Sequence, residues 1–245
     1  MDIALHIYGG MWYRGAMLPF SLAQIVVEHP AWAKVLDRHG IDYRCAGRQL
    51  LTQTCVPRGL DAAAIEREMR ATPEEPGARA EVLEGVLTHV LTDHHAFLRR
   101  ELPRLGEMLE GVEAFPGGPD LNKLRDAYRH FAVDLLEHLH HEEDDLFPAC
   151  RGLVAGDTSP ADRERLAKAV RDMFAEHSAA SDEMERLRGL TGDYMPPEGA
   201  PPAYRELLGA MSAMDADTHR HMHEENNLIV PLALGVLGAQ AVGAG

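Results

Sequence analysis

The sequence predicts an all-α protein: an antiparallel four-helix bundle preceded by a small N-terminal helical domain. The 245 residues are 45% hydrophobic but only 6% aromatic. Alanine and leucine are abundant and runs of β-branched residues are scarce, a composition that favours helices packed on helices. Four long segments with apolar residues at three- and four-residue spacing are separated by short stretches rich in proline and glycine. This is the sequence form of an up-and-down bundle.

The small domain is predicted to span residues 1–72. Short helical patterns broken by proline and glycine run through residues 21–70 and indicate a cluster of short helices. Residues 1–18 combine glycines and aromatics without a period, and we assign them no function. The stretch 71–77 holds two prolines and a glycine, which is typical of a linker.

The bundle is predicted to span residues 78–240. The breaks between its periodic segments place the helices at about 78–112, 120–150, 160–189 and 202–236. Pro119 and Pro160 stand at two of these starts, where a proline in the first turn is favoured, as is a serine or threonine cap.

Two of the predicted helices repeat a pattern of metal ligands. Glu142 follows His138 by four residues, Glu225 follows His221 by four residues, and each glutamate precedes a proline by six. Residues four apart lie on one face of a helix, so each pair presents an imidazole beside a carboxylate. One such pair alone is compatible with a core histidine next to a solvated glutamate. The repetition favours metal binding.

Both pairs interrupt apolar stripes that should face the core of the bundle. The stripe around the second pair consists of Leu207, Met211, Met214, Thr218, His221, Glu225, Leu228 and Leu232. Two carboxylates buried in one core need positive charge nearby, and neither stripe carries a lysine or arginine. A divalent or trivalent metal is the expected counter-charge, with the two glutamates as bridges between two ions.

The other two long helices each carry one inward histidine. His95 is the single polar residue on its stripe, and His177 interrupts the stripe of the third helix. A lone histidine on an apolar face is more often a core residue than a ligand, but four helices that each carry one favour a shared site. The predicted metal ligands are His95, His138, Glu142, His177, His221 and Glu225.

Other polar residues near these positions receive lesser roles. His130 and Asp134 lie two turns and one turn before His138, and we expect them to orient its ring. Three further histidines are interpreted as flanking residues: His94, His141 and His219.

The net charge and the cysteines indicate which classes of partner and which cellular compartment to expect. A net charge of −15 argues against binding to nucleic acid or to an anionic membrane. Cys45, Cys55 and Cys150 are too few and too scattered for a disulfide framework, which fits a reducing compartment. The chain starts without the basic and apolar pattern of a signal peptide, and no segment reaches the length of a membrane span. We therefore expect a cytoplasmic protein.

The order of the candidate ligands resembles that of the repair-of-iron-centres family of hemerythrin-like di-iron proteins. The matching features are His95 before Arg100 to Pro103, His138 with Glu142 and Leu146 to Pro148, Glu176 with His177, the loop from Thr191 to Pro197, and His221 with Glu225 to Asn227. The segment from Gly40 to Gly47, with Cys55, resembles the family's ScdA-type N-terminal domain.

The resemblance implies a centre of two non-haem irons with carboxylate and oxo bridges. It also implies a bacterial protein of the nitrosative and oxidative stress response that takes part in iron–sulfur cluster repair. Nitric oxide and oxygen species would be its small-molecule ligands, and iron–sulfur proteins its clients.

Two positions depart from the family pattern. The family has two adjacent cysteines where this chain has Arg44 and Cys45, so a role for a thiol pair is in doubt. The family also places a further ligand histidine after the first long helix, where this chain has Pro116. Since proline cannot bind a metal, one iron is expected to lack a ligand, with water, Glu113 or a displaced histidine in its place, and to offer an open position.

Two other functions stay open at this stage. A hemerythrin-like oxygen or nitric oxide carrier or sensor would bind without turnover, although Ser181 stands where oxygen carriers have a second histidine one turn after His177. A ferritin-type oxidase or iron store would need Glu-x-x-His pairs on two helices. This chain has one such pair, Glu137 with His140, off the inward stripe.

Overall fold

The fold is entirely helical, as predicted. The computed structural model describes residues 19–157 and 159–235, and within these ranges the regular elements are helices, apart from an isolated bridge between Ser21 and Leu50. The chain divides between Glu75 and Pro76 into two compact units. Over the same ranges, no helix is long and apolar enough to cross a membrane.

The first unit is a cluster of short helices around its own apolar core. Its elements are α1 (Leu22–Glu28), the 3₁₀ turn η1 (Pro30–Trp32), α2 (Ala33–Arg38), α3 (Leu51–Cys55), the 3₁₀ turn η2 (Val56–Arg58) and α4 (Ala62–Ala71). Ser21 caps α1 in a reciprocal capping box with Gln24, and Asp61 caps α4. Cys55 is buried in this unit, whereas Cys45 is exposed.

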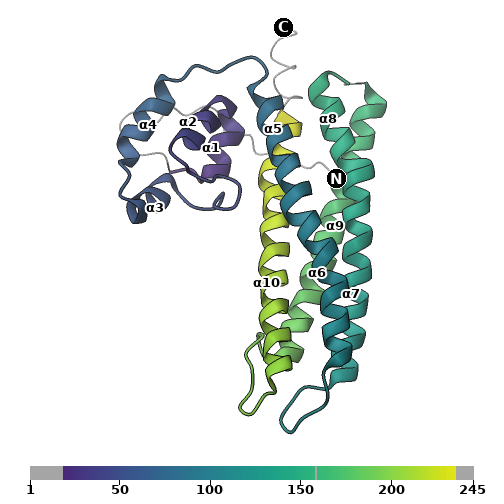
Figure 1. Cartoon of the computed structure of the whole chain (residues 1–245). Helices are drawn as coiled ribbons and strands as arrows, with labels where there is room; N and C mark the ends of the chain where they lie inside the picture. Colours follow the sequence, from purple (N-terminus) through teal and green to yellow (C-terminus); the bar gives the residue numbers. More distant parts are fainter. Residues whose placement is uncertain (1–18, 158, 236–245) are drawn as a thin grey trace. The chain divides into compact units, whose positions relative to one another are not determined.

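The second unit is the four-helix bundle. Its elements are α5 (Ala78–His89), η3 (Val90–His95) and α6 (Ala96–Gly111); α7 (Leu121–His141), η4 (Glu142–Leu146) and α8 (Phe147–Ala155); α9 (Pro160–Thr191); and α10 (Pro202–Glu224) with η5 (Glu225–Ile229). These elements form four long rods, and in Figure 1 the α6–α7 and α9–α10 loops lie at the same end of the bundle. Since α7 packs against α6 and α9, and α10 packs against the same two helices, the four rods enclose a common interior.

The side chains that fill this interior follow the predicted stripes. All eight residues of the stripe along the fourth rod are fully buried: Leu207, Met211, Met214, Thr218, His221, Glu225, Leu228 and Leu232. Each large apolar member contributes about 1.5–3 kcal/mol by its burial. The rod is therefore held firmly in register, and the two polar ligand candidates are carried inward with the apolar residues.

Three of the four rods contain a π-helical turn, and each turn touches a candidate ligand. The segment η3 ends at His95, η4 begins at Glu142 and η5 begins at Glu225. A π turn fits one extra residue into the helix and rotates the side chains that follow, and such turns are frequent at functional sites. In the first rod Leu91 is consequently half-buried and His94 lies inside beside His95. His94, interpreted as a flanking residue, is therefore buried next to His95 but belongs to neither group that contains the six predicted ligands.

The far end of α6 is capped by a side chain from the next rod. The guanidinium of Arg125 on α7 donates to the carbonyl oxygens of Leu109, Glu110 and Val112, at 2.9–3.4 Å. These carbonyls lie at or just beyond the helix end, where no further turn offers them an amide partner. A positive charge at this position also complements the helix dipole.

We expect Arg125→Met to lower the free energy of unfolding by about 1.5–3 kcal/mol, since hydrogen bonds to a charged group are lost. The matched control is Arg129→Met, one turn further along α7, whose side chain is 63% exposed against 22% for Arg125. The control should stay within about 0.5 kcal/mol of the wild type. Urea unfolding measures both variants, and equal losses would contradict the capping role.

Candidate metal centre

The structure brings all six predicted ligands together in the interior of the bundle. Each of the four rods contributes, and none of the six residues is more than 4% exposed. They form two overlapping groups: His95, Glu142, His221 and Glu225 in one, and His138, Glu142, His177 and Glu225 in the other. Both glutamates belong to both groups.

Glu142 lies between the two pairs of histidines. Its Oε2 atom is 3.4 Å from Nε2 of His95 and 3.4 Å from Nε2 of His221. Its Oε1 atom is 3.1 Å from Nε2 of His138 and 3.6 Å from Nε2 of His177. One carboxylate thus points one oxygen at each pair.

The two oxygens of Glu225 also point at different pairs of histidines. Its Oε1 atom lies 2.7 Å from Nε2 of His221 and 4.0 Å from Nε2 of His95. Its Oε2 atom lies 3.1 Å from Nε2 of His177. Each half of the site therefore collects two imidazole nitrogens and two carboxylate oxygens.

This arrangement fits metal ions. Donor atoms about 2.0–2.2 Å from a metal lie about 3.0–3.4 Å from one another, close to most of the distances observed here. Among the described residues no hydrogen bond reaches Nε2 of His138 and His177, either oxygen of Glu142, or Oε2 of Glu225. Buried polar atoms almost always have partners, so a cluster of such atoms facing one centre indicates ligands. Imidazole together with carboxylate suits iron.

The electrostatics of the six side chains point the same way. Burial alone would lower the pKa of His177, but Glu142 and Glu225 raise it to about 9. The pKa of His221 also rises against burial, mainly through the charge of Glu225. Burial would raise the pKa of Glu142, but the surrounding histidines, His138 first, hold it well below its usual range. The shifts of Glu142, His177 and His221 all show that this part of the interior favours positive charge beside the carboxylates.

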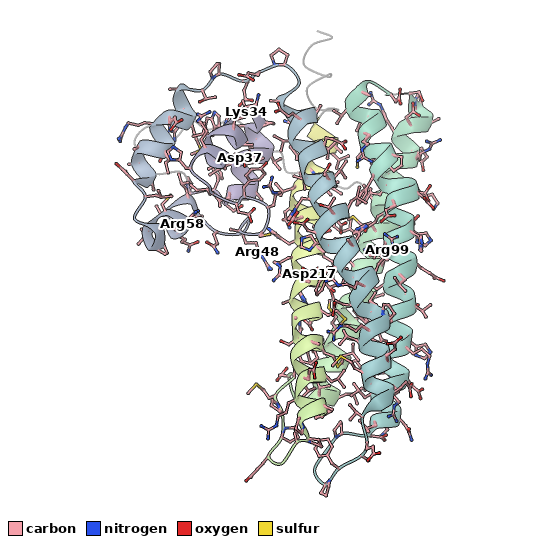
Figure 2. The ribbon with its side chains drawn as sticks, in the orientation of Figure 1. Lys34, Asp37, Arg48, Arg58, Arg99 and Asp217 are labelled. Carbon is pink, nitrogen blue, oxygen red and sulfur yellow. The ribbon has the colours of Figure 1, made fainter. Side chains whose placement is uncertain are left out.

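Carboxylates behind the ligands fix the orientation of the rings. Nδ1 of His95 lies 2.7 Å from Oε1 of Glu143, and Arg99 holds that carboxylate through both of its oxygens, at 2.5 and 3.1 Å. Arg99 lies on α6, where Figure 2 labels it. With Nδ1–H donating to Glu143, Nε2 of His95 is the ring atom suited to bind a metal.

The ring of His138 is oriented from α9. Its Nδ1 lies 2.8 Å from Oε2 of Glu176, whose other oxygen lies 2.7 Å from Nδ1 of His141. The predicted orienting residues, His130 and Asp134, are both exposed, so that prediction was wrong. The partner comes from another helix, and the stripe of one helix does not reveal it.

The rings of His177 and His219 have different surroundings. His177 has Oδ1 of Asn226 3.1 Å from its Nδ1. His219 is half-buried, and Arg188 and the Asp215 carbonyl lie within hydrogen-bond distance of its ring. It contacts neither group of ligands, in agreement with its interpretation as a flanking residue.

The predicted difference between the two metal positions is absent from the described site. Pro116 and Glu113 lie in the loop after α6, a helix of 16 residues that begins next to His95. At 1.5 Å per residue the end of α6 is about 24 Å along the bundle from its start. Glu113 therefore cannot reach the ligands. Both halves of the site have two histidines and two carboxylates, so neither is short of a donor relative to the other.

The thiols contribute nothing to this donor set. Cys150 is fully buried, and burial raises the pKa of its thiol to about 12. It stays protonated at neutral pH, and a thiol binds metal as the thiolate. Cys45 belongs to the small unit.

Comparison with known proteins agrees with this geometry. Residues 86–233 match the model of the hemerythrin HHE cation binding domain, and residues 20–72 match a domain of unknown function, DUF542. The chain is 29% identical over 221 residues to proteins named iron-sulfur cluster repair protein YtfE from Yersinia pseudotuberculosis (strain PB1/+) and Yersinia pestis (strain Pestoides F). Each alignment covers 87% of this chain and 96% of the relative.

The hemerythrin match covers more than half of the chain and contains all six candidate ligands, and the second match covers the small unit. The chain belongs to the hemerythrin-like proteins of the repair-of-iron-centres family.

Proposed function

We propose that the chain binds two non-haem irons and takes part in the repair of iron–sulfur clusters damaged by nitric oxide or oxidants. One observation carries the proposal: Glu142 and Glu225 each point one carboxylate oxygen at each pair of histidines. Such carboxylates are suited to bridge two ions. The names of the Yersinia relatives, which the chain covers almost completely, supply the biological role.

Each iron would be held by four protein donors. His95 and His221 would hold one iron, His138 and His177 the other, and the two glutamates would be shared. Bound iron supplies affinity for nitric oxide and oxygen species, and a pair of ferric ions commonly carries an oxo bridge. Iron with imidazole and carboxylate ligands often binds more than four donor atoms. Each ion would therefore keep a position for a small molecule.

A surface cavity gives small molecules a route to the site. It has a volume of about 540 Å³ and lies between the second rod and α9. Its lining includes Glu142 and the orienting residue Glu176, with Arg165 and Lys168 nearer the solvent. A cavity that ends on a ligand suits entry of nitric oxide or departure of iron. The clients of such chemistry would be iron–sulfur proteins of the cytoplasm.

A carrier or sensor of oxygen or nitric oxide is the second candidate, and the same cavity favours it. The residue one turn after His177 bears on this choice. The hydroxyl of Ser181 donates to the carbonyl of His177 in its own helix at 2.8 Å, and Ser181 is exposed rather than facing the site. The ligand set therefore departs from that of the oxygen carriers. A carrier would bind gas and leave a damaged cluster unchanged.

The function is tested on a [4Fe–4S] enzyme inactivated with nitric oxide. We expect the iron-loaded chain to restore the activity of that enzyme, and Glu225→Ala to restore little or none because both metal positions lose a donor. Asp144→Asn, an exposed change beside the site, is the control and should act like the wild type. Reversible nitric oxide binding without any recovery of the enzyme would support the carrier instead.

The orienting carboxylates give a second test. We expect Glu143→Gln to weaken iron binding by about 10–100-fold, the usual effect of losing a partner behind a metal-bound histidine. The affinity is measured by competition with a chelator. Asp144→Asn removes a neighbouring carboxylate that is exposed and should leave the affinity unchanged. An equal, small effect of both variants would show that the Glu143 contact with His95 does not matter for binding.

A further inference from the structure

A second group of metal-ligand side chains lies beside the six. His89 at the end of α5, His94 in η3 and Glu224 at the end of α10 bring one donor atom each within 4.8 Å of the others. None of the three was singled out as a ligand from the sequence. Glu224 is fully buried and His94 is 3% exposed, so these are interior groups rather than a solvated surface cluster.

His89 and His94 each point their Nε2 atom at Oε1 of Glu224. Nε2 of His89 lies 3.4 Å from Oε1 of Glu224, and Nε2 of His94 lies 3.2 Å from that oxygen. These are the separations of donors that share one metal at about 2.0–2.2 Å. Two histidines and one glutamate also form a known set of three zinc ligands that keeps a further position open.

The opposite side of each ring is fixed by a carboxylate. Nδ1 of His94 lies 3.0 Å from Oδ2 of Asp217, and Nδ1 of His89 lies 2.9 Å from Oδ2 of Asp93. Asp217 lies on α10, where Figure 2 labels it, and Arg220 pairs with its other oxygen at 3.0 Å. With Nδ1–H donating to a carboxylate, Nε2 of each ring carries a lone pair, which is the arrangement of metal-bound histidine.

This arrangement favours a cation at the meeting point. Three carboxylates, those of Asp93, Asp217 and Glu224, surround the two rings. Glu224 lies in the interior, where a carboxylate needs positive charge beside it, and a bound cation supplies that charge without a proton on either Nε2. A divalent ion satisfies all three donors at once.

We propose that His89, His94 and Glu224 form a third, mononuclear site for a divalent first-row transition ion beside the pair of irons. The ring of His94 lies 5.9 Å from that of His221, so the two sites are neighbours. The side chain of His89 is 19% exposed, whereas the six ligands of the proposed iron pair are almost fully buried. The third ion is therefore the one that exchanges with solvent most readily. The third site could hold iron on its way into or out of the pair, and that role rests on the proposed function. The existence of the site does not depend on the proposed function.

The test is a titration of the iron-loaded full chain with zinc(II), followed by calorimetry and by metal analysis after gel filtration. We expect one zinc per chain with the iron content unchanged. His89→Ala and Glu224→Gln should each weaken zinc binding by at least about tenfold, no less than the loss of an outer partner costs. His130→Ala removes an exposed histidine of α7 and should bind zinc like the wild type.

Zinc uptake that is equal in the wild type and in both site variants, or that occurs only as iron is lost, would overturn the third site. Iron is counted on the same samples, which separates this outcome from a failure of the proposed function. A chain with fewer than two irons that still binds zinc through His89 and Glu224 would refute the iron pair and support the third site.

Discussion

The bundle is organised around two buried carboxylates, Glu142 and Glu225, which are 1% and 0% exposed and face four imidazoles. An isolated charge in a protein interior costs several kcal/mol, and two like charges in one place cost more. The apolar stripes of the four rods bury these groups together with the leucines and methionines around them. The fold therefore needs positive charge in its interior, and the proposed metal ions would supply it.

The π turns of three rods lie at the level of the candidate ligands. Each of the turns η3, η4 and η5 touches a candidate ligand, and each displaces the side chains that follow by about one position. In the first rod the same turn carries both His94 and His95 inward, toward different partners. One distortion therefore serves the iron site and the neighbouring group of His89, His94 and Glu224.

The bundle and the six candidate ligands could be predicted, because the spacing of apolar residues in the sequence shows which side of each helix faces the core. The spacing of His138 with Glu142 and of His221 with Glu225 places each pair on a buried stripe, and the structure brings these four together with His95 and His177. What could not be predicted depends on contacts between helices or on broken periodicity. The pairing of His138 with Glu176 crosses from one rod to another. A π turn leaves no mark in the pattern of apolar residues, so the inward position of His94 was missed.

The expectation at Pro116 depends on a distance that the sequence pattern does not show. The 16 residues of α6 separate the loop at Pro116 from the candidate ligands by about 24 Å. The two candidate positions have equivalent sets of donors among the described residues. Each position uses two histidines, one from each of two rods, and shares the same two glutamates.

The most direct measurement is an iron count on the anaerobically reconstituted chain, with Glu142→Ala and Glu225→Ala beside the wild type. Because each glutamate serves both positions, the account predicts two irons in the wild type and the loss of both in either variant. A wild type with one iron, or a variant that loses one iron and keeps the other tightly bound, would contradict the shared carboxylates on which the proposed centre depends.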